Sequence, residues 1–166
     1  NIKMTDAATN RLVPLGVQRT EGVEATFAGQ LPGGWQLWSG FAWLDARMIS
    51  SPAIDAGQPV QGKRPTLTPK RSAMLWAAKE VAPKLRAGAG ITYVDDRYAN
   101  PGNTVTLAAY ATVDAMVQYR VGPLELQLNL NNLADRRYTV SGHGSSPNLN
   151  LPGAPRNAQL TARYVF

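Results

Sequence analysis

The chain has 166 residues, of which 44% are hydrophobic and 17% charged, so its composition is that of a folding protein and excludes a disordered segment. No stretch approaches the roughly 20 consecutive apolar residues of a membrane-spanning helix, and the absence of cysteine excludes disulfides, thiolate zinc sites and thiol catalysis. A formal net charge of +6 permits attraction to anions, but no basic cluster with interleaved aromatic residues occurs, so nucleic acid is not an expected partner.

Alternation of apolar and polar residues predicts β-strands along most of the chain. The clearest case is LELQLNLNNL, where the leucines occupy one face and the glutamate, glutamine and asparagines the other. Glycines on the second face of KLRAGAGITYV leave space behind that face. In the more apolar WQLWSGFAWLDARMI, we expect Leu37, Phe41 and Trp43 on the apolar side. In chain order, the predicted strands cover residues 1–4, 16–31, 35–49, 71–81, 84–94, 110–120, 124–133 and 156–166.

The connections between these strands alternate in length. Short turns rich in Gly and Pro lie at 32–34, 82–84 and 121–123, and longer polar connections lie near 5–15, 50–69, 99–109 and 135–154. Such alternation is typical of an antiparallel up-and-down meander. One end of the meander carries only short turns, here called the plain end, and the other end carries the long loops. Since no segment shows a sustained period of 3.6 residues, we predict an all-β fold of about eight strands.

This pattern favours part of a transmembrane β-barrel, with short turns on the periplasmic side and longer loops outside. Lipid cannot satisfy backbone hydrogen bonds, so strands cross it only within a closed barrel. A soluble β-sandwich or lipocalin-like barrel would also alternate, but here the polar face is nearly uncharged in mid-strand and rich in Asn, Gln, Thr and Gly. Aromatic residues are expected at both interfaces: Trp35, Tyr119, Tyr164 and Phe166 near the short turns, and Trp43, Tyr93, Tyr98, Tyr110 and Tyr138 near the loops. We therefore expect a location in the outer membrane of a Gram-negative bacterium.

Several stretches carry a resemblance to a known family. They include GVQRTEGVEATFAG, QGKRPTLTPKRSAMLWAAKEV, LNLNNLADRRY and LPGAPRNAQLTARYVF, in this order. In these blocks the chain resembles the TonB-dependent outer-membrane receptors, and among them the ferric-siderophore receptors. The resemblance implies a 22-stranded barrel around an N-terminal plug, with a short segment that contacts the energy-coupling protein TonB. We expect residues 1–166 to be the C-terminal portion of such a barrel, without the plug and without that TonB box.

The resemblance implies that the intact protein binds a ferric siderophore and imports it with TonB-coupled energy. The iron chelate would be a transported ligand, so no resident cofactor is expected. An alternative is a small, complete outer-membrane barrel with a structural or adhesive role. The first interpretation is favoured because residues 1–4 look like the tail of a strand already under way.

An enzymatic role has little support in the sequence. His143 is the only histidine, and a hydrolase would have to pair it with Ser141 or Ser145 and with Asp135. The spacing is uninformative, and a loop of Gly and Ser supplies no rigid base geometry. A single histidine without cysteines or clustered carboxylates cannot complete a metal coordination shell, so we predict neither an enzyme nor a metal site.

Three sets of residues are candidates for function. For the loop end, the resemblance implies capture of the chelate, and the candidates there are Arg64, Arg97, Tyr98, Tyr110, Arg136, Arg137, Tyr138 and His143. Their alternatives are an aromatic belt and contacts with lipopolysaccharide phosphates. The end of the chain resembles the signal read by the barrel-assembly machinery, and the matching residues are Ala158, Leu160, Ala162, Tyr164 and Phe166. These side chains are also expected to face lipid.

The third set is a predicted ion network on the lumen wall near the periplasmic rim, formed by Arg120, Glu125 and Arg163. Its alternative role is docking of the plug. The expected partners are therefore outer-membrane lipid and lipopolysaccharide, the barrel-assembly machinery and, only through the N-terminal part that this stretch lacks, the TonB complex.

Overall fold

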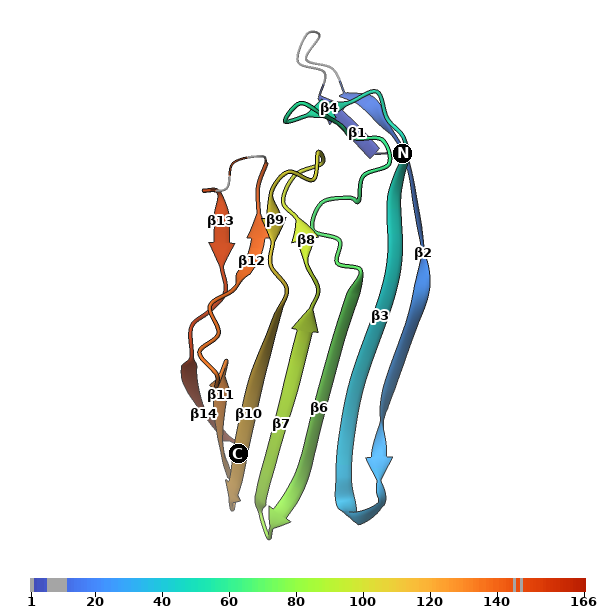
Figure 1. The fold of residues 1–166 in the computed structure, drawn as a ribbon. Coiled ribbons are helices and arrows are strands. Elements are labelled where there is room, and N and C mark those ends of the chain that lie inside the picture. Colours follow the sequence, from blue (N-terminus) through green and yellow to red (C-terminus); the bar gives the residue numbers. More distant parts are fainter. Residues whose placement is uncertain (1, 6–11, 145, 147) are drawn as a thin grey trace.

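The computed structural model describes residues 2–5, 12–144, 146 and 148–166 of the chain. Its main feature is one antiparallel sheet of eight strands that follow one another in chain order (Figure 1). They are β1 (Ile2–Thr5), β2 (Leu12–Leu31), β3 (Trp35–Ser50), β6 (Arg71–Ala82), β7 (Leu85–Val94), β10 (Tyr110–Val121), β11 (Leu124–Asn131) and β14 (Asn157–Tyr164). Within the described part of the chain, no helix is long and apolar enough to cross a membrane. The sheet confirms the predicted all-β meander.

The strands are joined at one end by short turns whose residues suit their backbone angles. One is the 3-10 turn η1 (Pro32–Gly34). Lys84 has a φ of 65° directly after Pro83, which is the arrangement of a type II turn. Gly122 has a φ of 55° directly before Pro123, as the first central residue of a type II′ turn requires. The Gly and Pro chemistry of the sequence therefore locates the plain end correctly.

The opposite end carries three small hairpins, which Figure 1 shows above the main sheet. They are β4 (Ile54–Asp55) with β5 (Gln58–Pro59), β8 (Arg97–Tyr98) with β9 (Thr106–Leu107), and β12 (Thr139–Gly142) with β13 (Asn150–Pro152). Most of the buried apolar side chains also lie toward this end, among them Met48, Val60, Ala99 and Leu107. The described part of the chain is thus an open wall with a small packed core among its loops.

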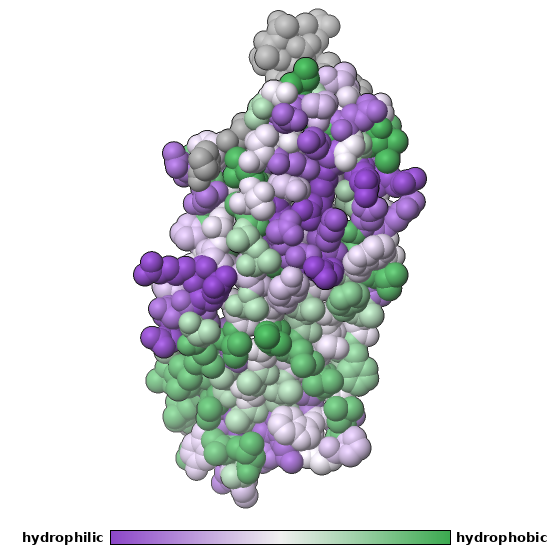
Figure 2. Space-filling model, viewed as in Figure 1, coloured by the Kyte–Doolittle hydropathy of each residue, from purple (hydrophilic) through white to green (hydrophobic). Residues whose placement is uncertain are grey.

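The two faces of the sheet differ in chemistry. One face, here called the outward face, carries Val23, Phe41, Leu75, Ile91 and Leu128, each with 36% to 60% of its surface exposed. The register carries this face from strand to strand, and it includes the apolar positions predicted from the sequence. On the side visible in Figure 2, hydrophobic side chains gather over the lower half, where the long strands run, and hydrophilic ones gather toward the loops.

The other face, here called the lumen face, is mostly polar but includes a pair of tryptophans. Trp38 lies opposite Trp76 across β3 and β6. Gly90 on β7 makes room for Trp76, because a Cβ atom at Gly90 would lie only 2.3 Å from a ring atom of that tryptophan. The sequence predicts space behind this glycine face, but it does not identify the tryptophans that fill it, because β3 and β6 are apolar on both faces.

Several strand ends differ from the predicted ones. The second strand begins at Leu12, inside the predicted connection, and β14 ends at Tyr164, two residues before the end of the chain. The penultimate strand ends at Asn131, because Asn132 adopts a φ of 51° and leaves the ladder. The alternation of apolar residues therefore predicts the middle of each strand better than its ends.

Candidate functional site

At the loop end, Arg64 is held by contacts on several sides. Its Nη2 atom lies 2.6 Å from Oδ2 of Asp96, and its guanidinium lies over the ring of Tyr98, 4.6 Å from the centroid. Asn103 accepts a hydrogen bond from the Arg64 backbone N–H and donates one to its carbonyl oxygen. Burial opposes the charge, but hydrogen bonds with Asp96 and Tyr98 outweigh it and raise the pKa of Arg64. These contacts tie the segment before β6 to the loop after β7.

Arg97 is more deeply placed than Arg64, with 3% of its surface exposed. Its Nη2 atom donates to the carbonyl oxygens of Thr139 and Val140, at 2.6 and 2.7 Å. Its guanidinium lies 5.2 Å from the ring centroid of Tyr110, and Tyr110 stacks on Tyr138 at 4.3 Å. Among the described residues, no hydrogen-bond partner reaches its buried Nη1 atom. Arg97 therefore joins the hairpin of β8 and β9 to β12.

Two residues absent from the predicted set organise the same loops. Asn100 is completely buried, and its Oδ1 atom accepts hydrogen bonds from the backbone N–H groups of Thr104 and Val105. The Oδ2 atom of Asp55 accepts hydrogen bonds from the Asn100 side chain and from the backbone N–H of Gly102, the latter at 2.8 Å. The Asn-Pro-Gly-Asn run at 100–103 signals a turn, but nothing in the sequence connects it to Asp55.

Asn132 has the same role where β11 ends. Its backbone N–H donates to Asp114, and its side-chain nitrogen donates to the carbonyl oxygens of Arg136 and Ala154. Its Oδ1 atom accepts from the backbone N–H of Arg136. This arrangement fixes the backbone of Arg136, while the side chains of Arg136 and Arg137 stay exposed.

The structure thus separates the predicted ligand-binding residues into two groups. Arg64, Arg97 and the stacked tyrosines are engaged in contacts between loops. The exposed group is Arg136, Arg137 and His143, and the backbone N–H of His143 donates to Leu149 in the same loop. Within the described residues, no three His, Cys, Asp or Glu side chains lie close enough together to hold a metal ion.

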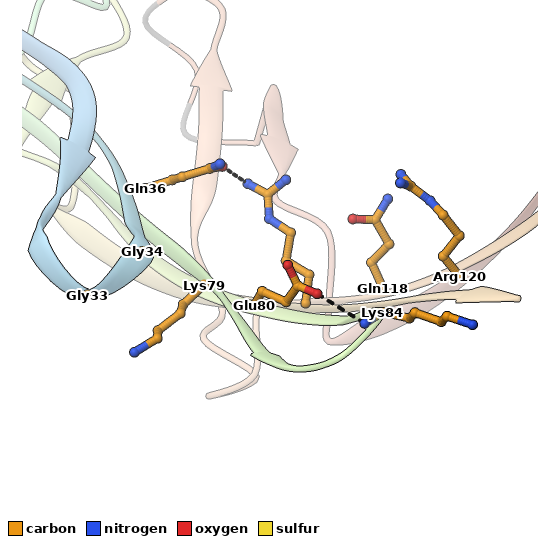
Figure 3. Close-up of a pocket in the computed structure, with 9 residues that line it drawn as sticks. Gly33, Gly34, Gln36, Lys79, Glu80, Lys84, Gln118 and Arg120 are labelled. Atoms are coloured by element: carbon orange, nitrogen blue, oxygen red, sulfur yellow. Dashed lines mark hydrogen bonds between the residues drawn. The ribbon is translucent and has the colours of Figure 1, made fainter.

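At the short-turn end, a polar cavity of about 400 Å³ opens beside the turns (Figure 3). It is lined by Gly33, Gly34, Gln36, Lys79, Glu80, Lys84, Arg86, Gln118 and Arg120. Glu80 accepts a hydrogen bond from the Lys84 backbone N–H at 3.0 Å, which supports the tight turn. Gln36 accepts a hydrogen bond from Arg86. Arg120, which lines this cavity, is also a member of the predicted ion network.

The structure brings the three residues of that network to one place. Arg120 Nη2 lies 2.8 Å from Oε2 of Glu125, and Arg163 is the register partner of Glu125 on the next strand. Because 66% of the Arg120 side chain is exposed in this wall, the pair contributes little stability by itself. The pair lies on the lumen face of the sheet.

The residues of the predicted assembly signal share the outward face of β14. Ala158, Leu160, Ala162 and Tyr164 lie opposite the four leucines of β11. Phe166 lies beyond the strand, and its ring meets that of Tyr164 edge to face at 5.1 Å. The other edge of β14 pairs with no strand within the described residues.

Comparison with known proteins agrees with this architecture. Residues 3–133 match the family described as TonB dependent receptor-like, beta-barrel. The chain is 31% identical over 159 residues to a probable TonB-dependent siderophore receptor, PiuA, of Acinetobacter baumannii, covering 92% of the chain and 21% of that protein. It is 30% identical over 161 residues to the ferrioxamine receptor of Yersinia enterocolitica, covering 93% of the chain and 22% of that protein.

Solved structures agree as well. The crystal structure of PiuA superimposes with a TM-score of 0.83 at 28% identity, over 94% of this chain and 23% of that one. The closed form of the ferric-catecholate import receptor Fiu of Escherichia coli gives a TM-score of 0.78 at 26% identity, over 99% of this chain and 23% of that one. The chain spans about a fifth of the length of the curated relatives it matches. It belongs to the TonB-dependent receptor family, as part of the outer-membrane β-barrel of such a receptor.

Proposed function

We propose that residues 1–166 form the C-terminal part of the barrel of a receptor that binds a ferric siderophore and imports it with TonB-coupled energy. The observation that carries this proposal is the 31% identity to a siderophore receptor across 92% of the chain. The relatives are named for unlike chelates, ferrioxamine and catecholates. We therefore propose ferric siderophores as the ligand class.

The exposed loop residues support a capture surface for such a chelate. Arg136, Arg137 and His143 are exposed at the loop end, and cationic side chains suit an anionic iron chelate. The more deeply placed Arg64 and Arg97 position the loops, because their guanidinium groups already bind Asp96 and two backbone carbonyls. A small, complete barrel with a structural or adhesive role is the second candidate function.

Uptake by the intact protein distinguishes these functions. A strain without other siderophore receptors would receive the gene of the intact protein and be supplied with radioactive iron as ferrioxamine or as a ferric catecholate. We expect uptake of at least one chelate, loss of that uptake without TonB, and weaker uptake in Arg136→Gln/Arg137→Gln. Absence of TonB-dependent uptake of either chelate, from a normally assembled protein, would favour the structural or adhesive barrel.

A second part of the proposal concerns assembly. We propose that Ala158, Leu160, Ala162, Tyr164 and Phe166 are read by the barrel-assembly machinery. Phe166 supports this role because it is exposed beyond the last strand and contacts only the ring of Tyr164 among the aromatic side chains described. Phe166→Ser in the intact protein should reduce the amount of heat-modifiable, membrane-inserted receptor, and unchanged insertion would contradict the proposal.

A further inference from the structure

The lumen face of the sheet has two halves of unlike chemistry. On the half formed by β3, β6 and β7, the mid-strand positions include Trp38, Met74, Trp76 and Gly90. On the half formed by β10, β11 and β14, six lumen-facing side chains end in a neutral amide. These side chains, here called the amide column, are Gln118, Gln127, Asn129, Asn131, Asn157 and Gln159.

The register places the members of the amide column in adjacent rows. The opposite pairs are Gln118 with Gln127, Gln159 with Asn129, and Asn157 with Asn131. Gln127 Nε2 donates to Oδ1 of Asn129 at 2.9 Å. Asn131 Nδ2 donates to Oδ1 of Asn157 at 2.9 Å as well. The column thus follows β11 along the lumen face for about 14 Å.

At the loop end, the amide column meets the exposed arginines of the proposed capture surface. Asn132 follows the last amide of β11, and its side chain hydrogen-bonds both the backbone N–H and the carbonyl oxygen of Arg136. The same side chain donates to the carbonyl oxygen of Ala154, three residues before the first amide of β14. The backbone of Arg136, next to Arg137, is therefore anchored at the loop end of the column.

At the short-turn end, the amide column meets the ion network. Oε2 of Glu125 lies 2.8 Å from Nη2 of Arg120, and Arg163 lies opposite Glu125 on the next strand. These three side chains line a cavity of about 220 Å³. On the described lumen face of β11 and β14, no charged side chain lies between the two ends of the column. The column therefore connects the proposed capture surface to a polar cavity through neutral groups of these strands.

Neutral amides suit the passage of a hydrophilic solute. Each amide has two donors and an acceptor, so it can bind the polar groups of a solute of either charge. Within the described residues, the Oε1 atom of Gln127 and the Nδ2 atom of Asn129 have no hydrogen-bond partner. Passage requires binding that is favourable enough for entry and weak enough, at several sites, for release. The mid-strand positions on the lumen face of β3, β6 and β7 carry no such amide.

We infer that the amide column is the path along which a ferric siderophore crosses this part of the barrel, moving from one amide pair to the next. The inference rests on the function proposed above, and it adds the part of the wall that the chelate follows. A neutral path accepts chelates of either charge. A charge placed on the column should therefore discriminate between chelates of opposite charge, whereas a charge on the tryptophan half should not.

The test measures uptake of radioactive iron by cells that express the intact receptor with Gln127→Glu or Gln127→Lys. For a ferric catecholate, which is anionic, we expect initial uptake about tenfold slower in Gln127→Glu than in Gln127→Lys, because the carboxylate repels the chelate and the ammonium group attracts it. For ferrioxamine B, which carries a free ammonium group, the order should reverse. Binding of the chelate to cells that lack TonB reports capture alone and should be equal for the two variants.

Ala28→Glu and Ala28→Lys are the matched controls. Ala28 is exposed on the lumen face of β2, opposite Trp38, and the tryptophan pair separates it from the amide column. Its two variants should import each chelate at equal rates. Gln159→Glu and Gln159→Lys repeat the comparison at an exposed position of β14, in case a variant of Gln127 does not assemble.

The outcomes separate this inference from the function on which it rests. Absence of TonB-dependent uptake of either chelate by the assembled wild-type receptor would overturn both. Uptake by wild type, with equal rates for the carboxylate and ammonium variants of the column, would overturn the inference alone. A charge effect of the same size at Ala28, or one already present in binding to cells without TonB, would also overturn it.

Discussion

The wall of the sheet and its loop end are stabilised in different ways. In the wall, backbone ladders join one strand to the next, and the outward side chains face the membrane. At the loop end, a few polar side chains carry the connections, and Arg97 and Asn100 are almost completely buried there. We conclude that a single polar substitution should matter more among the loops, whereas the wall should be sensitive only where strands approach closely.

The largest effect is expected at Arg97. Arg97→Ala removes two charge-assisted hydrogen bonds to the carbonyls of Thr139 and Val140 and leaves those oxygens without their donor. The contact between the loops should weaken by about 3 kcal/mol. Limited proteolysis of the intact receptor should show faster cleavage near residues 139–152, while the barrel remains membrane-inserted.

Arg97→Lys is the conservative control for this experiment. A lysine keeps the charge but lacks the planar fork and the stacking surface over Tyr110. Arg97→Lys should therefore keep only part of the protease resistance of the wild-type loops. Equal protease resistance of wild type and Arg97→Ala would show that the loops are held together by other contacts.

In the wall, the largest effect is expected at Gly90. Gly90→Ala would place a methyl group 2.3 Å from a ring atom of Trp76 and 2.8 Å from the carbonyl oxygen of Leu75. Such overpacking costs about 1 to 3 kcal/mol. Gly40→Ala is the matched control, because its methyl group would meet only Met74, at 3.4 Å. The midpoint temperature at which the folded receptor converts to its heat-denatured form should be lower for Gly90→Ala. Identical midpoint temperatures for Gly90→Ala and wild type would contradict the close approach of β7 to Trp76.

A smaller, pH-dependent effect is expected where the wall meets the loops. Burial would raise the pKa of Asp95, but hydrogen bonds from Arg71, from the backbone N–H of Asp96 and from Tyr93 outweigh it and hold the pKa below its ordinary value. A carboxyl with a depressed folded-state pKa stabilises the fold at a pH above its unfolded value. That stabilisation is lost as the pH falls through the lowered pKa.

Protease resistance of the loop at 95–107 should therefore be constant at neutral pH and fall only in strongly acidic solution. Asp95→Asn should reduce this resistance at pH 7 and abolish its acid dependence. A wild-type loop that loses protection already between pH 7 and pH 5 would contradict this assignment.

The wall and the loop end also differ in how far they could be predicted from the sequence, because they are stabilised in different ways. The period of two in β11 and the Pro and Gly of the turns are local signals, so the wall, its faces and its plain end could be predicted. The roles of Asp55 and Asn132 arise from partners distant in the chain, to which no local pattern points. Arg97 illustrates the limit, since the sequence identifies a charged residue at the loop end but not that its guanidinium is buried.

This chain is a wall with one face toward lipid and one face toward a lumen. Residues 1–166 contain no native cysteine that would compete for a nitroxide label. A single cysteine can therefore be introduced at each of residues 126 to 130 of β11 in the intact receptor and labelled in the membrane. Electron paramagnetic resonance should give high accessibility to oxygen at Leu126, Leu128 and Leu130, and low accessibility at Gln127 and Asn129. Accessibility that does not alternate with a period of two, or that peaks at Gln127 and Asn129, would contradict the account.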